Sequence, residues 1–166
     1  GEISSGVTTM GFNFLILGLT GNTGIAAYGV FANVALVATA VFNGISQGSQ
    51  PLLSDYYGKN DDKSVQKILR LSIITGIAAA VLIILVTNLI PDVIVAVFNN
   101  ENNAEMASYA VFGVQLYFTG FLFAGFNIIG TGFLSATESA AWAFITSVLR
   151  GFVAISLCAL LLSALF

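Results

Sequence analysis

The sequence has little of what a water-soluble enzyme uses. It has no histidine, one cysteine, five basic and eight acidic side chains among 166 residues. About a quarter of the residues of an ordinary soluble domain are charged, whereas here the charged fraction is 8%. Without histidine, and with Cys158 as the lone thiol, zinc, haem and histidine-based catalysis lack their usual ligands. We therefore expect no enzyme, no metal site and no cofactor.

What the sequence does contain is apolar. Hydrophobic residues make up 57% of the chain and the mean hydropathy is +0.95, which excludes disorder and predicts a polytopic membrane protein. Because no large basic patch exists, we expect no nucleic-acid partner. The chain begins at Gly1 and ends at Phe166 inside an apolar run, so we expect it to be a piece of a longer protein.

Charges and turn-like clusters divide the chain into five expected membrane-spanning helices. Helices fit better than alternating strands, because apolar runs such as residues 73–90 show no period of two. A turn-like cluster at residues 20–24 divides the long uncharged stretch that precedes Asp55. The expected spans cover about residues 1–19, 25–53, 68–97, 104–135 and 140–166, each near the ~20 residues that cross a bilayer core, or longer.

The distribution of basic residues predicts an orientation. Four of the five lie in or beside the charged segment of residues 55–67. The segment of residues 98–104 has acidic residues in and beside it and no basic ones. By the positive-inside rule, residues 55–67 are expected in the cytoplasm and residues 98–104 outside, in the plasma (inner) membrane.

Polar side chains on the second expected span are the main candidates for a site. Asn43, Gln47 and Gln50 fall within about 60° of arc on a helix, with Asn33 at the edge of that arc. A polar stripe on an apolar helix faces protein or water. One interpretation is a cavity wall that offers amides to a substrate, and the other is hydrogen bonding between helices. Both stay open from the sequence. A Gly44-xxx-Gly48 pattern on the same span permits close helix contact.

Other polar residues are expected at membrane depth. The uncharged candidates for a substrate or ion pathway are Asn13, Gln115, Tyr117 and Asn127. Glu2 precedes an apolar stretch, where a carboxylate with a raised pKa could exchange a proton or hold Na⁺. Arg150 lies about ten residues into the fifth span, and we expect it to form a structural ion pair with Glu138 or Asp55.

Several of these segments resemble the MATE (multidrug and toxic compound extrusion) transporters. Ala26-Ala-Tyr-Gly-Val30, Phe42-Asn-Gly-Ile-Ser-Gln-Gly-Ser-Gln-Pro-Leu52 and Tyr56-Tyr-Gly-Lys59 look like the eighth helix and following loop of that family. The Phe12-Asn13 region looks like the seventh helix and Ser147-Val-Leu-Arg-Gly151 like part of the eleventh. The resemblance covers essentially the whole chain as helices seven to eleven of a twelve-helix, two-lobe, all-α transporter.

The resemblance implies a secondary antiporter that exports amphipathic, often cationic compounds in exchange for Na⁺ or H⁺. Its implied partners are the lipid bilayer, a missing N-terminal lobe and a small amphipathic substrate. In some members, acids on the seventh and tenth helices bind the cation. Glu2 matches the first of these, but the fourth span has no acid beyond Glu105 at its outer end, and Asn127 is the nearest polar group at depth. The alternatives are a lipid-linked precursor flippase of the same superfamily and a structural membrane bundle without transport activity of its own. A channel lacks a recognisable filter sequence.

Overall fold

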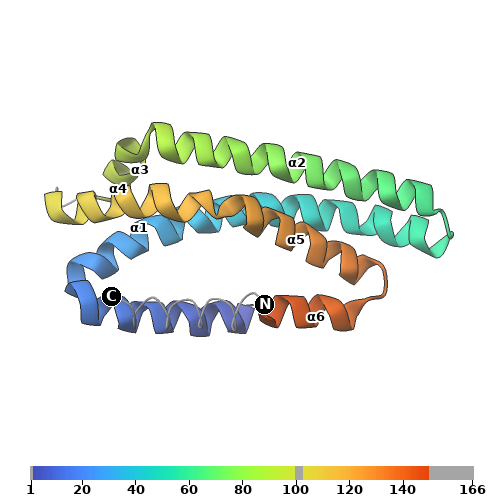
Figure 1. Ribbon diagram of the computed structural model, residues 1–166, viewed down its shortest axis with the longest axis horizontal. Coiled ribbons are helices and arrows are strands. Elements are labelled where there is room, and N and C mark those ends of the chain that lie inside the picture. Colours follow the sequence, from blue (N-terminus) through green and yellow to red (C-terminus); the bar gives the residue numbers. More distant parts are fainter. Residues whose placement is uncertain (1, 100–102, 150–166) are drawn as a thin grey trace.

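The structure, a computed structural model, describes residues 2–99 and 103–149, without the side chains of residues 2–9, 12, 15, 19 and 140. The described residues form helices joined by short connections (Figure 1), which confirms the all-α prediction. The helices are α1 (Glu2–Gly58), α2 (Asp62–Leu89), α3 (Pro91–Phe98), α4 (Ala104–Thr119), α5 (Phe121–Ala136) and α6 (Ala140–Val148).

Helix α1 reverses its direction at Gly21. The backbone there has φ 66° and ψ −156°, a conformation that glycine adopts without the steric cost of a Cβ atom. In Figure 1 the first half of α1 and the part beyond Gly21 run in opposite directions. The break lies within the cluster of residues 20–24 that separates the first two expected spans.

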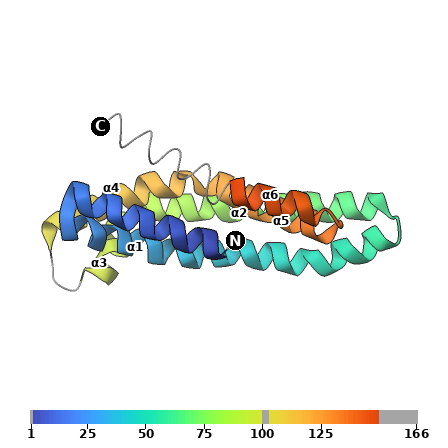
Figure 2. The same ribbon diagram turned by 90° about the horizontal axis from the view of Figure 1, so that it is seen from below.

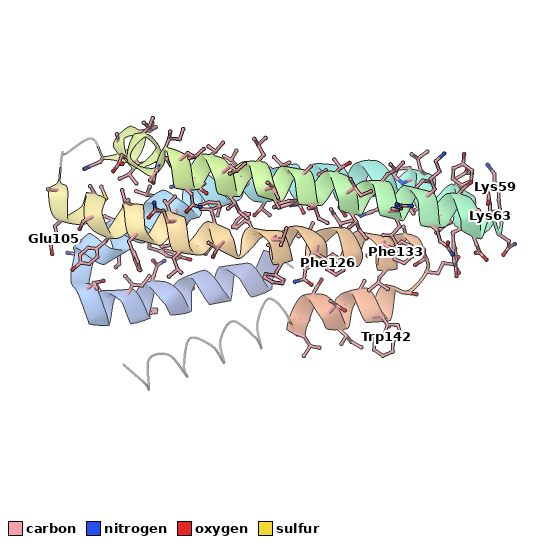
Figure 3. The ribbon with its side chains drawn as sticks, turned by 45° about the horizontal axis from the view of Figure 1, so that its top comes forward. Lys59, Lys63, Glu105, Phe126, Phe133 and Trp142 are labelled. Carbon is pink, nitrogen blue, oxygen red and sulfur yellow. The ribbon has the colours of Figure 1, made fainter. Side chains whose placement is uncertain are left out.

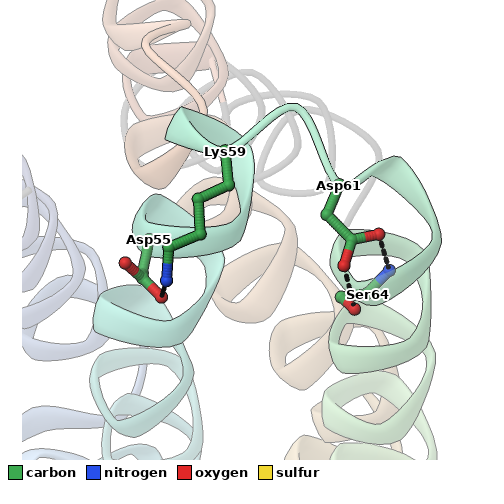
Figure 4. Close-up of polar contacts among 4 residues, drawn as sticks. All are labelled: Asp55, Lys59, Asp61 and Ser64. Atoms are coloured by element: carbon green, nitrogen blue, oxygen red, sulfur yellow. Dashed lines mark hydrogen bonds and ion pairs between the residues drawn. The ribbon is translucent and has the colours of Figure 1, made fainter.

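The charged segment of residues 55–67, expected to be a loop, is helical except for residues 59–61. Two local interactions extend the helices into it (Figure 4). Lys59 forms an ion pair of 2.6 Å with Asp55 one turn earlier in the chain. Asp61 caps α2, because its carboxylate accepts hydrogen bonds from the backbone N–H of Ser64 at 3.2 Å and from the Ser64 hydroxyl at 2.6 Å.

Two of the expected spans are interrupted. The third is divided between α2 and α3, because Pro91 lacks a backbone N–H and starts a new helix. The fourth is bent by 46° between α4 and α5. The bend lies at Gly120, whose N–H donates to the carbonyl of Tyr117, three residues earlier, at 3.2 Å.

The core lies where α1 packs against α2 and α4–α5. Glycines of α4 and α5 make room for bulky side chains of α1. A Cβ atom at Gly113 would lie 2.8 Å from the ring of Phe31, and one at Gly125 would lie 2.6 Å from the ring of Phe42. Phe42 is completely buried, so these contacts fix the rotation of α1 about its own axis.

A third glycine, Gly132, continues this line of close contacts between α1 and α4–α5, which we call the seam. A Cβ atom at Gly132 would collide with the hydroxyl of Ser46. The Ser46 hydroxyl donates to the carbonyl of Ile128 at 3.4 Å, and the Ser54 hydroxyl donates to that of Ala136 at 3.1 Å. Both bonds join residues 82 apart, so α1 and α5 run in parallel. The Gly44-xxx-Gly48 pattern makes no helix contact in the described part of the chain, because both glycines are exposed and a Cβ atom there would meet nothing within 4 Å.

Two helical segments lie to one side of this core. The first half of α1 and α6 form a second layer, below the others in Figure 1 and nearest the viewer in Figure 2. Helix α6 contacts α5. Lys59 and Lys63 lie at one end of the bundle and Glu105 lies at the other (Figure 3).

Among the described residues, two helical segments, Thr20–Gly58 and Asp62–Leu89, are long and apolar enough to cross a membrane. The bent pair α4–α5 makes a third if it is taken as one span. Many large side chains on these helices are exposed and apolar, which is what a lipid solvent requires.

The contact between Gly125 and Phe42 can be tested by substitution. Gly125→Ala is expected to lower the free energy of unfolding by about 1–3 kcal/mol, because the added methyl group overpacks the buried ring of Phe42. Gly130→Ala is the control on the same helix, since a Cβ atom there meets nothing within 4 Å. Thermal unfolding of the intact protein in detergent measures both. Equal melting temperatures for the two variants would contradict this packing.

The cap of α2 predicts a pH dependence. Hydrogen bonds from the Ser64 hydroxyl and N–H lower the pKa of Asp61. A lowered pKa contributes stability that is present above the unfolded-state pKa of about 3.9 and is lost as the pH falls through the folded-state pKa. Asp61→Ala is therefore expected to melt earlier than wild type at pH 7, with a gap that closes in acid. Asp61→Asn, which keeps a capping oxygen, serves as the control, and a gap that persists unchanged in acid would refute the cap.

Candidate functional site

The seam with α4–α5 determines which face of α1 is left uncovered. Phe42, Ser46 and Leu53 are buried and follow one another at helical spacings. They place one side of α1 against its neighbours and leave uncovered the exposed side chains that lie about 80–120° around the helix from it. The candidate site is on this uncovered side.

The amide side chains of Asn43 and Gln47 lie on the uncovered side. Both are exposed, and neither forms a hydrogen bond with another described residue. Gln50 lies at the edge, half-buried, with its Nε2 atom 3.5 Å from the Ser46 hydroxyl. Asn33 is exposed and donates from Nδ2 to the carbonyl of Gly29 at 2.8 Å within its own helix. We call Asn33, Asn43, Gln47 and Gln50 the amide face of α1.

The surroundings of the amide face follow from the cost of an unpaired amide. Moving an amide from water into hydrocarbon without a hydrogen-bond partner costs several kcal/mol. Asn43 and Gln47 must therefore face water or another protein surface. The exposed surface of α1 also has an apolar sector, centred about 120° away around the helix. Val37, Val41 and Leu52 in that sector are 70%, 45% and 53% exposed, and they suit lipid.

The predicted residues on α4 and α5 are arranged around the bend. Tyr117 is 46% exposed, and its ring packs against Phe31 of α1 at 5.4 Å and Phe121 of α5 at 5.7 Å between centroids. Gln115 and Asn127 are half-buried. Asn127 accepts at its backbone carbonyl from the Thr131 hydroxyl at 2.7 Å. No hydrogen bond among the described residues joins these side chains to the amide face.

Of the remaining candidate residues, some have side chains that the structure describes and others do not. Asn13 is half-buried in the first half of α1. Glu2 is the first residue of α1, but its side chain lies outside the described residues, as does Arg150. Asp55 is paired with Lys59, and Glu138 is exposed in the turn before α6 with φ 57°.

The ion pair expected for Arg150 stays a prediction, and of its two expected partners Asp55 already has a lysine. In the described part of the chain, no group of three or more histidine, cysteine, aspartate or glutamate side chains could hold a metal ion.

Two features of the site are absent from the sequence prediction. The serines Ser46 and Ser54 bind α5 carbonyls and hold α1 against that helix. Ser46 and Ser54 are two helical turns apart, at the spacing of neighbouring residues along a helix surface, which could have identified the seam. The second feature is the cluster of aromatic rings at the bend, where Phe118 and Phe121 lie 4.6 Å apart between centroids. Phe31 and Phe42 of α1 join these rings only after the chain has folded.

Long apolar helices with uncharged polar groups at depth define a polytopic helical membrane protein. The MatE family model matches residues 4–160, and the chain belongs to this family. The Multidrug export protein MepA of Staphylococcus haemolyticus (strain JCSC1435) is 28% identical over 152 residues, which cover 90% of this chain and 32% of that protein. The chain thus spans about a third of the length of this relative. No solved structure matches the chain significantly.

These comparisons confirm the resemblance drawn from the sequence and its membrane setting. The family is one of transporters, which supports the expectation that the chain is not an enzyme. The comparisons carry no information on individual side chains, so the roles of the amide face, Glu2, Tyr117 and Asn127 stay predictions.

The two sectors of α1 predict a difference in thiol labelling. Asn43→Cys and Val41→Cys differ little in depth but point about 160° apart around the helix. With Cys158 replaced by serine, Asn43→Cys is expected to react at least about tenfold faster with a charged, water-soluble thiol reagent, because a thiolate forms only where water reaches it. The rates are measured in permeabilised membranes with the intact protein. Equal rates would mean that the amide face does not contact water.

Proposed function

We propose that the protein is a secondary antiporter that exports small amphipathic, cationic compounds in exchange for Na⁺ or H⁺. Family membership supports transport, and the name of the relative MepA, a multidrug export protein, supports export of several compounds. The observation that carries the proposal is the pair of exposed amides at Asn43 and Gln47, which form no hydrogen bond with another described residue and lie on a helix long and apolar enough to cross a membrane. Such groups are retained at membrane depth where they line a path for a polar cargo.

The proposal includes a partner for the amide face. A second six-helix lobe, outside the given sequence, would enclose an aqueous cavity together with this face. Rocking of the two lobes would then open the cavity alternately to each side of the membrane. The amides would offer donors and acceptors to the polar part of a substrate, and Tyr117 would offer an aromatic surface to a cation.

The proposed orientation places residues 55–67 in the cytoplasm and residues 98–104 outside the cell, in the plasma membrane. It is supported by the position of Lys59 and Lys63 at one end of the bundle and of Glu105 at the other (Figure 3). In this orientation substrate enters from the end that carries the lysines and leaves from the end of Glu105.

Glu2 is the proposed coupling residue of this lobe. A carboxylate in a cavity of low dielectric binds a proton or Na⁺ in one state of the transporter and releases it in the other. The difference in ion affinity between the two states would bias the conformational equilibrium and drive export. The fourth span has no acid at membrane depth to complete a site of two carboxylates, so a cation site in the other lobe is the alternative.

The test is a transport assay with the intact protein in vesicles under imposed Na⁺ or H⁺ gradients. The wild type is expected to move a cationic dye against its gradient, and Glu2→Gln is expected to abolish this, because the amide binds neither ion. Glu105→Gln is the control, since Glu105 is exposed at the start of α4. Dye transport coupled as in wild type in Glu2→Gln would remove Glu2 from the mechanism. Absence of ion-driven dye movement in wild type would contradict the proposed function.

A further inference from the structure

Helix α2 carries three basic side chains on one line. Lys63, Lys67 and Arg70 are all exposed and lie within about 60° of arc around the helix. None of them forms an ion pair with another described residue, whereas Lys59 is paired with Asp55 and lies 5.6 Å from the ring centroid of Tyr56. Asp62 is the nearest acid on this helix, and it points about 100° away from Lys63. The three positive charges are therefore without a counter-ion in this part of the chain.

The same line continues along α2 as exposed aliphatic side chains. Its members beyond Arg70 are Ile74, Ile77, Val81 and Leu85, each about half-exposed. The packed face of α2 includes Ser72, Gly76, Ala80 and Thr87 and is centred about 140° away. The line is thus a continuous outward surface, basic at one end and aliphatic for the rest of its length. We call it the α2 stripe.

The lengths of the two parts match the layers of a bilayer. From Lys63 to Arg70 the helix rises about 10 Å, and from Arg70 to Asn88, the next exposed amide, it rises about 27 Å. The hydrocarbon core is about 30 Å thick, and the headgroup layer on each side is about 5–8 Å thick. With the aliphatic part in the core, the three basic groups lie at headgroup level, which long side chains reach by extending toward the interface.

We propose that the α2 stripe binds an anionic phospholipid. Lys63, Lys67 and Arg70 hold its phosphate-bearing headgroup, and Ile74, Ile77 and Val81 contact its acyl chains. Arginine binds a phosphate through two parallel hydrogen bonds, and each basic side chain near an anionic surface adds about fivefold to the affinity. The aliphatic part selects a lipid over a soluble phosphorylated partner, because such a partner could not follow the stripe into the hydrocarbon core.

Native mass spectrometry of the intact protein, titrated in detergent with phosphatidylglycerol or phosphatidylcholine, tests the proposal. Wild type is expected to bind phosphatidylglycerol more tightly than phosphatidylcholine. The triple variant Lys63→Gln, Lys67→Gln, Arg70→Gln is expected to bind phosphatidylglycerol at least about tenfold more weakly, with phosphatidylcholine binding unchanged. The matched control Lys59→Gln removes a neighbouring charge that already has a partner and is expected to stay within about twofold of wild type.

Three results would overturn the proposal. The first is an undiminished preference for phosphatidylglycerol in the triple variant. The second is a loss of phosphatidylglycerol affinity in Lys59→Gln as large as in the triple variant. The third is binding of free glycerol phosphate as tight as that of the lipid. If the triple variant does not fold, Lys67→Gln and Arg70→Gln are tested singly, with a threefold to fivefold loss expected for each. Lipid binding is measured without any transport step, so failure of this inference and failure of the proposed antiport are separate outcomes.

Discussion

The rotation of α1 about its own axis is the constraint on which the rest of the structure depends. Phe42 fits over Gly125 and Ser46 over Gly132, and at both glycines a Cβ atom would collide with its neighbour. A helix held in this way along a parallel partner has one permitted rotation, because close-packed interiors tolerate little displacement. That rotation determines which of the side chains of α1 are buried and which are exposed.

Because of this rotation, the exposed surface of α1 has one part that suits water and another part that suits lipid. Asn43 and Gln47 point away from the seam without a partner in the described chain, and hydrocarbon does not accommodate unpaired amides. Val37 and Val41, on another sector, are exposed and apolar. A membrane helix with both sectors lies at the boundary between lipid and a polar space, which is the position that a cavity-lining helix of a transporter requires.

Composition was enough to predict the all-α membrane fold, and the turn-like cluster around Gly21 was enough to predict the first reversal. Three details depend on contacts that no composition reveals. The ion pair of Lys59 and the cap at Asp61 extend helices into a charged segment that was expected to be a loop. The bend at Gly120 involves one of 17 glycines. The amide face was identified as a stripe, but its environment depends on the seam, whose residues the sequence did not identify.

A spin-label scan along residues 33–54 of the intact protein in bilayers measures the direction in which the amide face points. Collision with a water-soluble relaxation agent should peak at residues 33, 43 and 47, and collision with oxygen should peak at residues 37, 41 and 52, so that the two maxima lie about 120° apart around the helix. Maxima in the same direction, or highest oxygen collision at residues 43 and 47, would place the amides in lipid and contradict the account.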